Sequence, residues 1–145
     1  MLFQNIILRV RLQPDSYSTQ VTKSPNISFL RRFFGSTPTN PASIMAAKAK
    51  ALSIIDENAV AVFSKSWCPY CKATKALLND LGAKYYTIEL DQVDDGAEIQ
   101  DALTEISGQR SVPNIYIKKQ HIGGNSDLQA KKAELPNLLK NAGAL

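Results

Sequence analysis

From Ala42 onward, apolar residues occur in short runs, at every second position, or at spacings of three and four. The first two patterns are typical of strands and the last of amphipathic helices. The predicted elements are a helix over 42–57, a strand over 59–64, a helix over 69–81, a strand over 84–90, a helix over 98–107, a hairpin of 114–118 and 120–123, and helices over 126–132 and 135–141. This alternation indicates an α/β domain that contains a right-handed βαβ unit.

Two connecting segments differ from ordinary linkers. The acidic segment 91–96 is interpreted as a solvated turn rather than a metal site. The hairpin turn contains Lys118-Lys119, whereas tight two-residue turns favour Asn and Gly because they require positive φ. We therefore expect a looser or longer turn there, and we interpret His121 beyond it as an ordinary strand residue.

The N-terminal segment has a different composition from the rest. The chain carries a net charge of +4, and residues 1–45 account for all of it, because residues 46–145 balance 12 basic against 12 acidic residues. Arginines, Ser and Thr with a single acid are typical of a mitochondrial transit peptide. The predicted division is a transit peptide and linker over 1–41 and a folded domain over 42–145. A tail without a targeting role is the alternative.

The expected location is therefore mitochondrial, and Met45 offers a second in-frame start that would give a cytosolic form. No apolar run approaches the roughly 18 residues of a membrane span, so the mature form is not expected in a membrane. The neutral remainder has no basic and aromatic patch, so nucleic-acid binding is not expected either.

The only two cysteines, Cys68 and Cys71, lie on the turn between the first strand and the following helix. Pro69 suits the first helical turn, where its missing N–H is not needed. Unpaired N–H groups, the helix dipole and the nearby Lys65 all stabilise a thiolate at Cys68. Cys71 lies one turn further in and is expected to be more buried. We predict that Cys68 is the nucleophile and Cys71 the resolving thiol.

Other uses of two cysteines fit less well. A zinc site needs four ligands, and His121 is too far along the chain to complete one convincingly. A structural disulfide gains little from so short a loop. Two inert buried thiols are the remaining alternative, but a Cys-x-x-Cys pair on a βα unit is typical of thiol–disulfide exchange in a reducing compartment.

The sequence Cys68-Pro69-Tyr70-Cys71, with Lys65 three residues upstream, resembles the active site of a dithiol glutaredoxin. Further segments resemble the same family at 99–103, 108–113 and 123–127, so that the resemblance covers 46–145. It implies a thioredoxin fold, in which a four-stranded mixed sheet is flanked by about five helices. Trp67, directly before the first cysteine, resembles the tryptophan at the same place in thioredoxins, but thioredoxins carry Gly-Pro between the two cysteines.

The resemblance also implies a site for glutathione. Lys65 and Gln100 would hold the glycine carboxylate, with Arg110 a lesser candidate. The Val112 backbone would pair with the glutathione cysteine, and Ser126 and Asp127 would bind the γ-glutamyl end. The implied glutathione-binding residues together are Lys65, Tyr70, Gln100, Ser111, Val112, Pro113, Ser126 and Asp127. Pro113 is expected to be cis.

Several of these residues have structural alternatives. Asp127 is a candidate helix N-cap, and Tyr70 a candidate core residue. Gln100 is the kind of polar residue that usually lies on a helix surface.

The implied activity is glutathione-dependent reduction of glutathionylated and disulfide-containing proteins by a monomer, with glutathione as co-substrate and no metal. Two alternatives remain. One is a glutaredoxin that binds a [2Fe–2S] cluster between two subunits, which Pro69 disfavours. The other is a thioredoxin-type reductase served by a flavoenzyme.

Overall fold

The computed structural model describes residues 40–145. The expectations for the transit peptide and most of the linker lie outside these residues. The elements are α1 (Pro41–Glu57), β1 (Val60–Ser64), α2 (Pro69–Asp80), β2 (Tyr86–Glu89), α3 (Gly96–Ser107), β3 (Asn114–Ile117), β4 (Gln120–Gly123), α4 (Asn125–Ala130) and α5 (Leu135–Ala142). Their order agrees with the predicted one. In this part of the chain, no helix is both long and apolar enough to cross a bilayer.

The strands form one four-stranded mixed sheet in the order β2-β1-β3-β4. β1 pairs in parallel with β2, and the helix between them is α2, as the sequence predicts for a βαβ unit. β3 pairs antiparallel with both β1 and β4. β1 therefore lies inside the sheet, which explains its nearly continuous apolar sequence and its complete burial.

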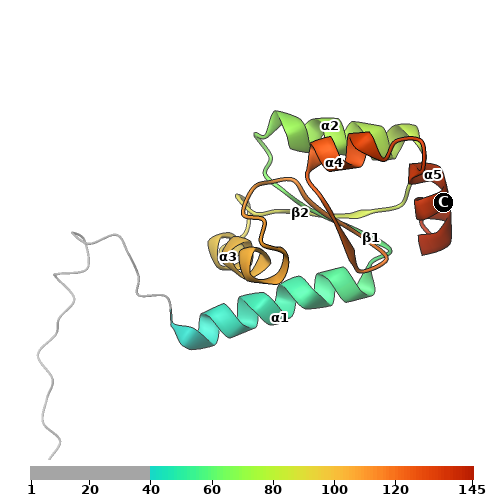
Figure 1. Ribbon diagram of the computed structural model, residues 1–145. Coiled ribbons are helices and arrows are strands. Elements are labelled where there is room, and N and C mark those ends of the chain that lie inside the picture. The colour runs from blue at the N-terminus through green and yellow to red at the C-terminus, as the bar shows by residue number, and fades with distance from the viewer. Residues whose placement is uncertain (1–39) are drawn as a thin grey trace, which may run out of the picture. The chain divides into compact units, whose positions relative to one another are not determined.

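Helices cover both faces of the sheet, with α1 and α3 on one side and α2 and α4 on the other (Figure 1). Successive residues of β1 point to opposite faces. Ala61 and Phe63 pack in the core beneath α1 and α3, where the Phe63 and Tyr116 rings meet edge to face. Val60 and Val62 pack in the second core, against leucines of α2, α4 and α5.

Helix α3 begins at Gly96, two residues earlier than the pattern predicted. Gly96 packs against the backbone of Leu90, where a β-carbon would lie only 1.8 Å from the Leu90 carbonyl oxygen. Glycine is a poor helix former, so the sequence pattern assigned it to the preceding loop. The close contact explains why glycine stands at the first position of this helix, since any side chain there would collide with Leu90.

The expectation of a loose hairpin turn is wrong. Lys118 and Lys119 form a two-residue turn, and both have positive φ, 49° and 66°, as a type I′ turn requires. The Lys118 N–H donates to the carbonyl of Ala59, and the Lys119 ammonium lies 3.1 Å from a carboxylate oxygen of Asp56. The backbone bond to Ala59, at the α1–β1 junction, helps to hold two lysines in a conformation that glycine and asparagine adopt more readily.

Candidate active site

Both cysteines lie at the start of α2. Cys68 is the N-cap residue with an extended backbone, and Pro69 begins the helix. Both cysteines are free thiols. The side chain of Cys71 is fully buried and Cys68 is 4% exposed, in agreement with the expected order. The two residues are one helical turn apart and their thiols interact, as a resolving thiol requires.

Burial raises the pKa of the Cys71 thiol. The Ser64 hydroxyl and the backbone N–H of Lys65 oppose this rise, and the neighbouring Cys68 adds to it. Cys71 is therefore held mainly as the neutral thiol, which is the weaker nucleophile. The raised pKa of Cys71 supports the assignment of the attacking role to Cys68.

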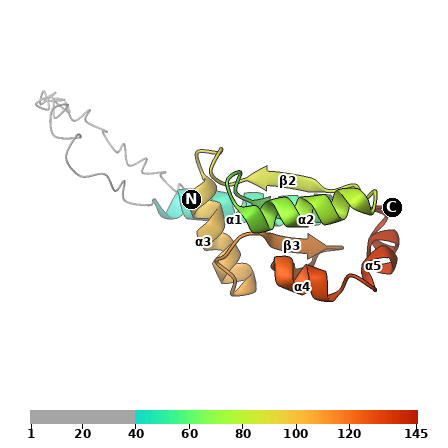
Figure 2. The same cartoon turned by 90° about the horizontal axis from the view of Figure 1, so that it is seen from above.

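The segment before β3 lies across from Cys68. The Val112–Pro113 peptide bond is cis, as the resemblance implies. The Cys68 sulfur lies 3.9 Å from the Val112 carbonyl oxygen, although the two residues are 44 positions apart. Figure 2 shows why they meet: α2, β3 and α4 all begin at the same end of the molecule.

A groove of about 380 Å³ lies beside these three N-terminal ends. The residues that line it are Tyr70, Gln109, Ser111, Val112, Pro113, Gly124, Asn125, Ser126 and Asp127. Six of these were predicted for the glutathione site. Tyr70 is 63% exposed, so the alternative that it packs in the core is wrong.

Two predicted residues do not line the groove. The Lys65 ammonium lies 5.8 Å from the centroid of the Trp67 ring, a distance at which cation and ring attract each other. The Gln100 amide donates to the Arg110 carbonyl at 2.7 Å, while the Arg110 side chain pairs with Asp101. The N–H groups that Gln100 was expected to offer to a carboxylate are thus partly engaged within the protein.

Asp127 occupies the third position of α4, and Gly124 is the N-cap residue. The Asp127 carboxylate accepts the Gly124 N–H at 2.8 Å, which satisfies a backbone donor at the helix start. Gly123, with φ of 115°, leaves space for this carboxylate, because a β-carbon there would lie 2.3 Å from Asp127 Oδ2. Asp127 therefore has a structural role, and it also faces the groove.

The sequence did not single out Gln109, Gly124 or Asn125 as site residues. Asn125 accepts a hydrogen bond from the buried Thr74 hydroxyl at 3.1 Å, which joins α4 to α2. The motifs at 108–113 and 123–127 contained all three groove residues. Their positions in those motifs were the only available signal, because their roles depend on contacts between separate elements.

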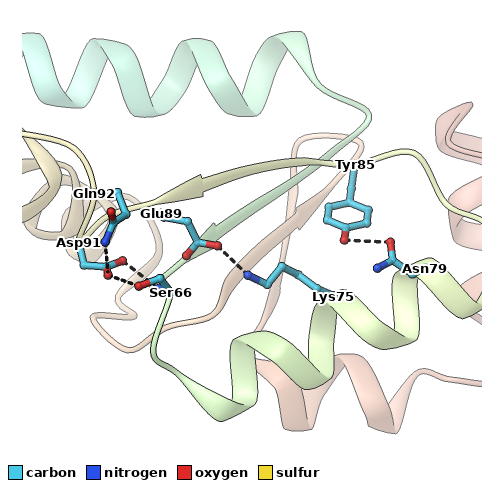
Figure 3. Close-up of polar contacts among 7 residues, drawn as sticks. All are labelled: Ser66, Lys75, Asn79, Tyr85, Glu89, Asp91 and Gln92. Carbon is cyan, nitrogen blue, oxygen red and sulfur yellow. Dashed lines mark hydrogen bonds and ion pairs between the residues drawn. The ribbon is translucent and has the colours of Figure 1, made fainter.

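Polar contacts also fix the loop that leads to Cys68 (Figure 3). The Asp91 carboxylate accepts hydrogen bonds from the Ser66 backbone N–H, the Ser66 hydroxyl and Gln92. These bonds, with the Ser66 hydroxyl the largest contributor, hold the pKa of Asp91 well below its usual range. Further along, Lys75 of α2 pairs with Glu89 of β2 at 2.6 Å. The loop that carries Cys68 is thus tied to the end of β2.

Comparison with known proteins places this site in a family. Residues 60–122 match the glutaredoxin family model. A glutaredoxin of Ricinus communis is 50% identical over 101 residues, which cover 68% of this chain and 99% of that protein. The chain belongs to the glutaredoxin family. "Glutaredoxin-C4, chloroplastic" of Oryza sativa subsp. japonica is 45% identical over 107 residues, which cover 72% of this chain and 80% of that protein.

The solved structures agree with the glutaredoxin assignment. The crystal structure of a buckwheat glutaredoxin–glutathione complex has a TM-score of 0.70 and 41% sequence identity, and the match covers 73% of this chain and 98% of that one. The thioredoxin fold predicted from the sequence is therefore confirmed. As a glutaredoxin, the protein is a thiol–disulfide oxidoreductase.

Proposed function

We propose that this glutaredoxin reduces protein–glutathione mixed disulfides and protein disulfides, with Cys68 as nucleophile and glutathione as reductant. The observation that carries the proposal is the position of the Cys68 sulfur. It lies at the N-cap of α2 and 3.9 Å from the carbonyl of Val112, a residue that lines the groove. A disulfide substrate whose backbone lies along Val112 would present a sulfur to Cys68.

In the first step, the Cys68 thiolate attacks the glutathionyl sulfur of the mixed disulfide. The original S–S bond breaks, a Cys68–glutathione disulfide forms, and the substrate thiolate leaves and takes up a proton. In the second step, the thiolate of another glutathione attacks the glutathionyl sulfur on Cys68. Glutathione disulfide leaves, and the electrons of the broken bond return to Cys68 as its thiolate.

Protein disulfides follow a second route. Cys68 attacks one sulfur and forms a mixed disulfide with the substrate, and Cys71 then displaces the substrate by attacking Cys68. Cys71 must lose its proton for this step, and the Ser64 hydroxyl and Lys65 N–H beside it stabilise the resulting anion. Two glutathione molecules then reduce the Cys68–Cys71 disulfide to two thiols.

The groove supports glutathione as the ligand. We assign the cysteinyl backbone of glutathione to Val112, in the manner of an added strand. We assign its γ-glutamyl end to Ser126 and Asp127, where the carboxylate of Asp127 can pair with the ammonium group. Tyr70 covers the sulfur, and Lys65 provides positive charge for the glycine carboxylate. The buckwheat relative is known in complex with glutathione, which supports this assignment.

The decisive experiment compares two electron donors for the purified domain. With a glutathionylated peptide as substrate, we expect turnover with glutathione and glutathione reductase. We expect none with thioredoxin reductase. The opposite preference would identify a thioredoxin-type reductase instead.

The cluster-binding alternative needs a separate measurement. We expect a colourless monomer after anaerobic purification, as judged by absorbance and size-exclusion chromatography. A brown dimer that loses its visible absorbance when glutathione is removed would assign the protein to cluster binding.

We also propose that residues 1–41 direct the protein to mitochondria, and that initiation at Met45 gives a cytosolic form. The arginine-rich composition of this segment supports the proposal. A fusion of residues 1–45 to a fluorescent protein should enter mitochondria. Entry into plastids, which the name of the rice relative raises as an alternative, would contradict it.

A further inference from the structure

The segment between α3 and β3 contains a side chain that folds back onto its own loop. The Gln109 amide nitrogen donates to the carbonyl of Ser111 at 3.0 Å and to the carbonyl of Pro113 at 2.9 Å. A primary amide nitrogen carries two N–H groups, so these two bonds use both. Gln109 therefore joins the two carbonyls that flank residue 112.

The backbone of Gln109 is itself fixed. Its N–H donates to the Ser107 hydroxyl at 3.2 Å, and its carbonyl accepts from the Asn114 amide at 3.1 Å. The same Asn114 amide donates to Ser107 at 3.2 Å, and Asn114 is 1% exposed. The backbone of Gln109 is thus held in place by Ser107 and Asn114, and its side chain reaches from there to the carbonyls of Ser111 and Pro113.

The Val112 carbonyl, which lies between the two carbonyls bound by Gln109, has a different partner. Val112 presents its carbonyl oxygen to the Cys68 sulfur at 3.9 Å. The carbonyls of Ser111 and Pro113 are turned to the Gln109 amide, whereas the carbonyl of Val112 between them is turned to Cys68. Gln109 thus fixes the backbone on both sides of Val112 while the Val112 carbonyl faces Cys68.

We propose that Gln109 is a positioning residue that fixes the Val112 backbone for pairing with the glutathionyl part of the substrate. This inference rests on the proposed function, because it concerns the same groove. Gln109 acts through Val112 and takes no part in the sulfur chemistry. Its loss should therefore weaken recognition of a glutathionyl group while leaving the intrinsic reactivity of Cys68 intact.

The test compares two disulfides of one peptide, in which the peptide cysteine carries either glutathione or 2-hydroxyethanethiol. The second has no peptide groups to pair with Val112. Single-turnover rates of the reduced enzyme are measured on both. The first variant is Gln109→Met, whose side chain has a similar length but no N–H. The second is Gln109→Glu, whose side chain has a similar shape but ends in a carboxylate, which cannot donate hydrogen bonds to the two carbonyls.

For both variants we expect the rate on the glutathionyl peptide to fall about tenfold, since the two hydrogen bonds that hold the backbone on either side of Val112 are lost. The rate on the hydroxyethyl peptide should stay within about twofold, and alkylation of Cys68 by iodoacetamide should be unchanged. Gln120→Met, at an exposed glutamine on β4, is the matched control and should behave as the wild type.

Three results would overturn the inference. Equal slowing on both disulfides would show a general structural role for Gln109. Unchanged rates on the glutathionyl peptide in both variants would show that the two bonds do not position Val112. A wild-type enzyme that does not prefer the glutathionyl peptide would overturn the proposed function, and the inference with it. The measurement on the wild-type enzyme thus distinguishes a failure of the proposed function from a failure of the inference about Gln109.

Discussion

The carboxylate of Asp127 accepts the backbone N–H of Gly124 at 2.8 Å, across the first turn of α4. Asp127 also lines the groove, together with Val112, whose carbonyl lies against Cys68. Structural and binding roles therefore meet in one side chain, and a substitution that keeps the acceptor but removes the charge can separate them.

We predict that Asp127→Asn raises the Michaelis constant for glutathione about tenfold, because an interaction with a charged group worth about 1.5 kcal/mol is lost. The amide oxygen of Asn can still accept the Gly124 N–H, so the melting temperature should change little. Asp127→Ala is the control, since it removes both roles and should also lower the melting temperature. Unchanged glutathione kinetics in Asp127→Asn would leave the residue with its structural role alone.

The two cysteines should differ when each is replaced by serine. We expect Cys68→Ser to reduce all turnover to the uncatalysed rate, since Cys68 alone lies at the helix N-cap against Val112. Cys71→Ser should keep the reduction of glutathionyl mixed disulfides and lose that of protein disulfides. Both rates are measured in the glutathione reductase-coupled assay. Appreciable turnover by Cys68→Ser would refute the assignment of the nucleophile.

Asp91 makes the stability depend on pH in the acid range. Its pKa is lowered in the folded state, mainly by the Ser66 hydroxyl, so its contribution is present above about pH 4, the pKa of an unfolded Asp. That contribution is lost as the pH falls toward the lowered value. We therefore expect Asp91→Asn to be less stable than the wild type at pH 6, with a difference that shrinks toward pH 2.

Urea unfolding at several pH values measures this difference. Asp94→Asn is the matched control, because Asp94 is an exposed acid of the same loop whose side chain makes no hydrogen bond within residues 40–145. A stability difference between Asp91→Asn and the wild type that is constant from pH 6 to pH 2 would contradict the prediction.

The hairpin turn offers a stabilising substitution. Lys119 has φ of 66°, a conformation that costs a residue with a β-carbon about 1 kcal/mol and glycine almost nothing. Replacing Lys118-Lys119 by Asn-Gly should raise the melting temperature by about 4–8 °C. The substitution removes the ion pair between Lys119 and Asp56, but this pair is exposed to solvent and contributes little to stability. Asp56→Asn measures that loss separately, and a lower melting temperature for Asn-Gly would show that the ion pair dominates.

A chain that begins at Met45 should fold and keep full activity. The buried residues of α1 begin at Ala47, beyond the removed segment. The truncation removes the Asn40 side chain that caps the helix by accepting the Ala42 N–H. Loss of such a cap costs about 1 kcal/mol, so a slightly lower unfolding midpoint is expected. An unfolded or inactive product would show that residues before Met45 belong to the domain.

The sequence by itself determined the elements and the reactive pair. Apolar spacing reflects which face of each segment is buried, and this information is local. It located the helices and strands to within two residues or so and placed Cys68 at a strand-to-helix turn. Motif resemblance added Tyr70, Val112, Ser126 and Asp127, all of which line the groove.

Only the tertiary structure decided how these segments meet. The contact of Cys68 with Val112 joins positions 44 apart, and no local pattern encodes such a distance. The turn at Lys118-Lys119 is tight because the Lys118 N–H donates to the Ala59 carbonyl in another part of the chain, against the local preference. The amide of Gln109 is bound to two carbonyls because the folded loop brings them within its reach. In each case the geometry depends on packing between distant segments, which residue spacing alone does not specify.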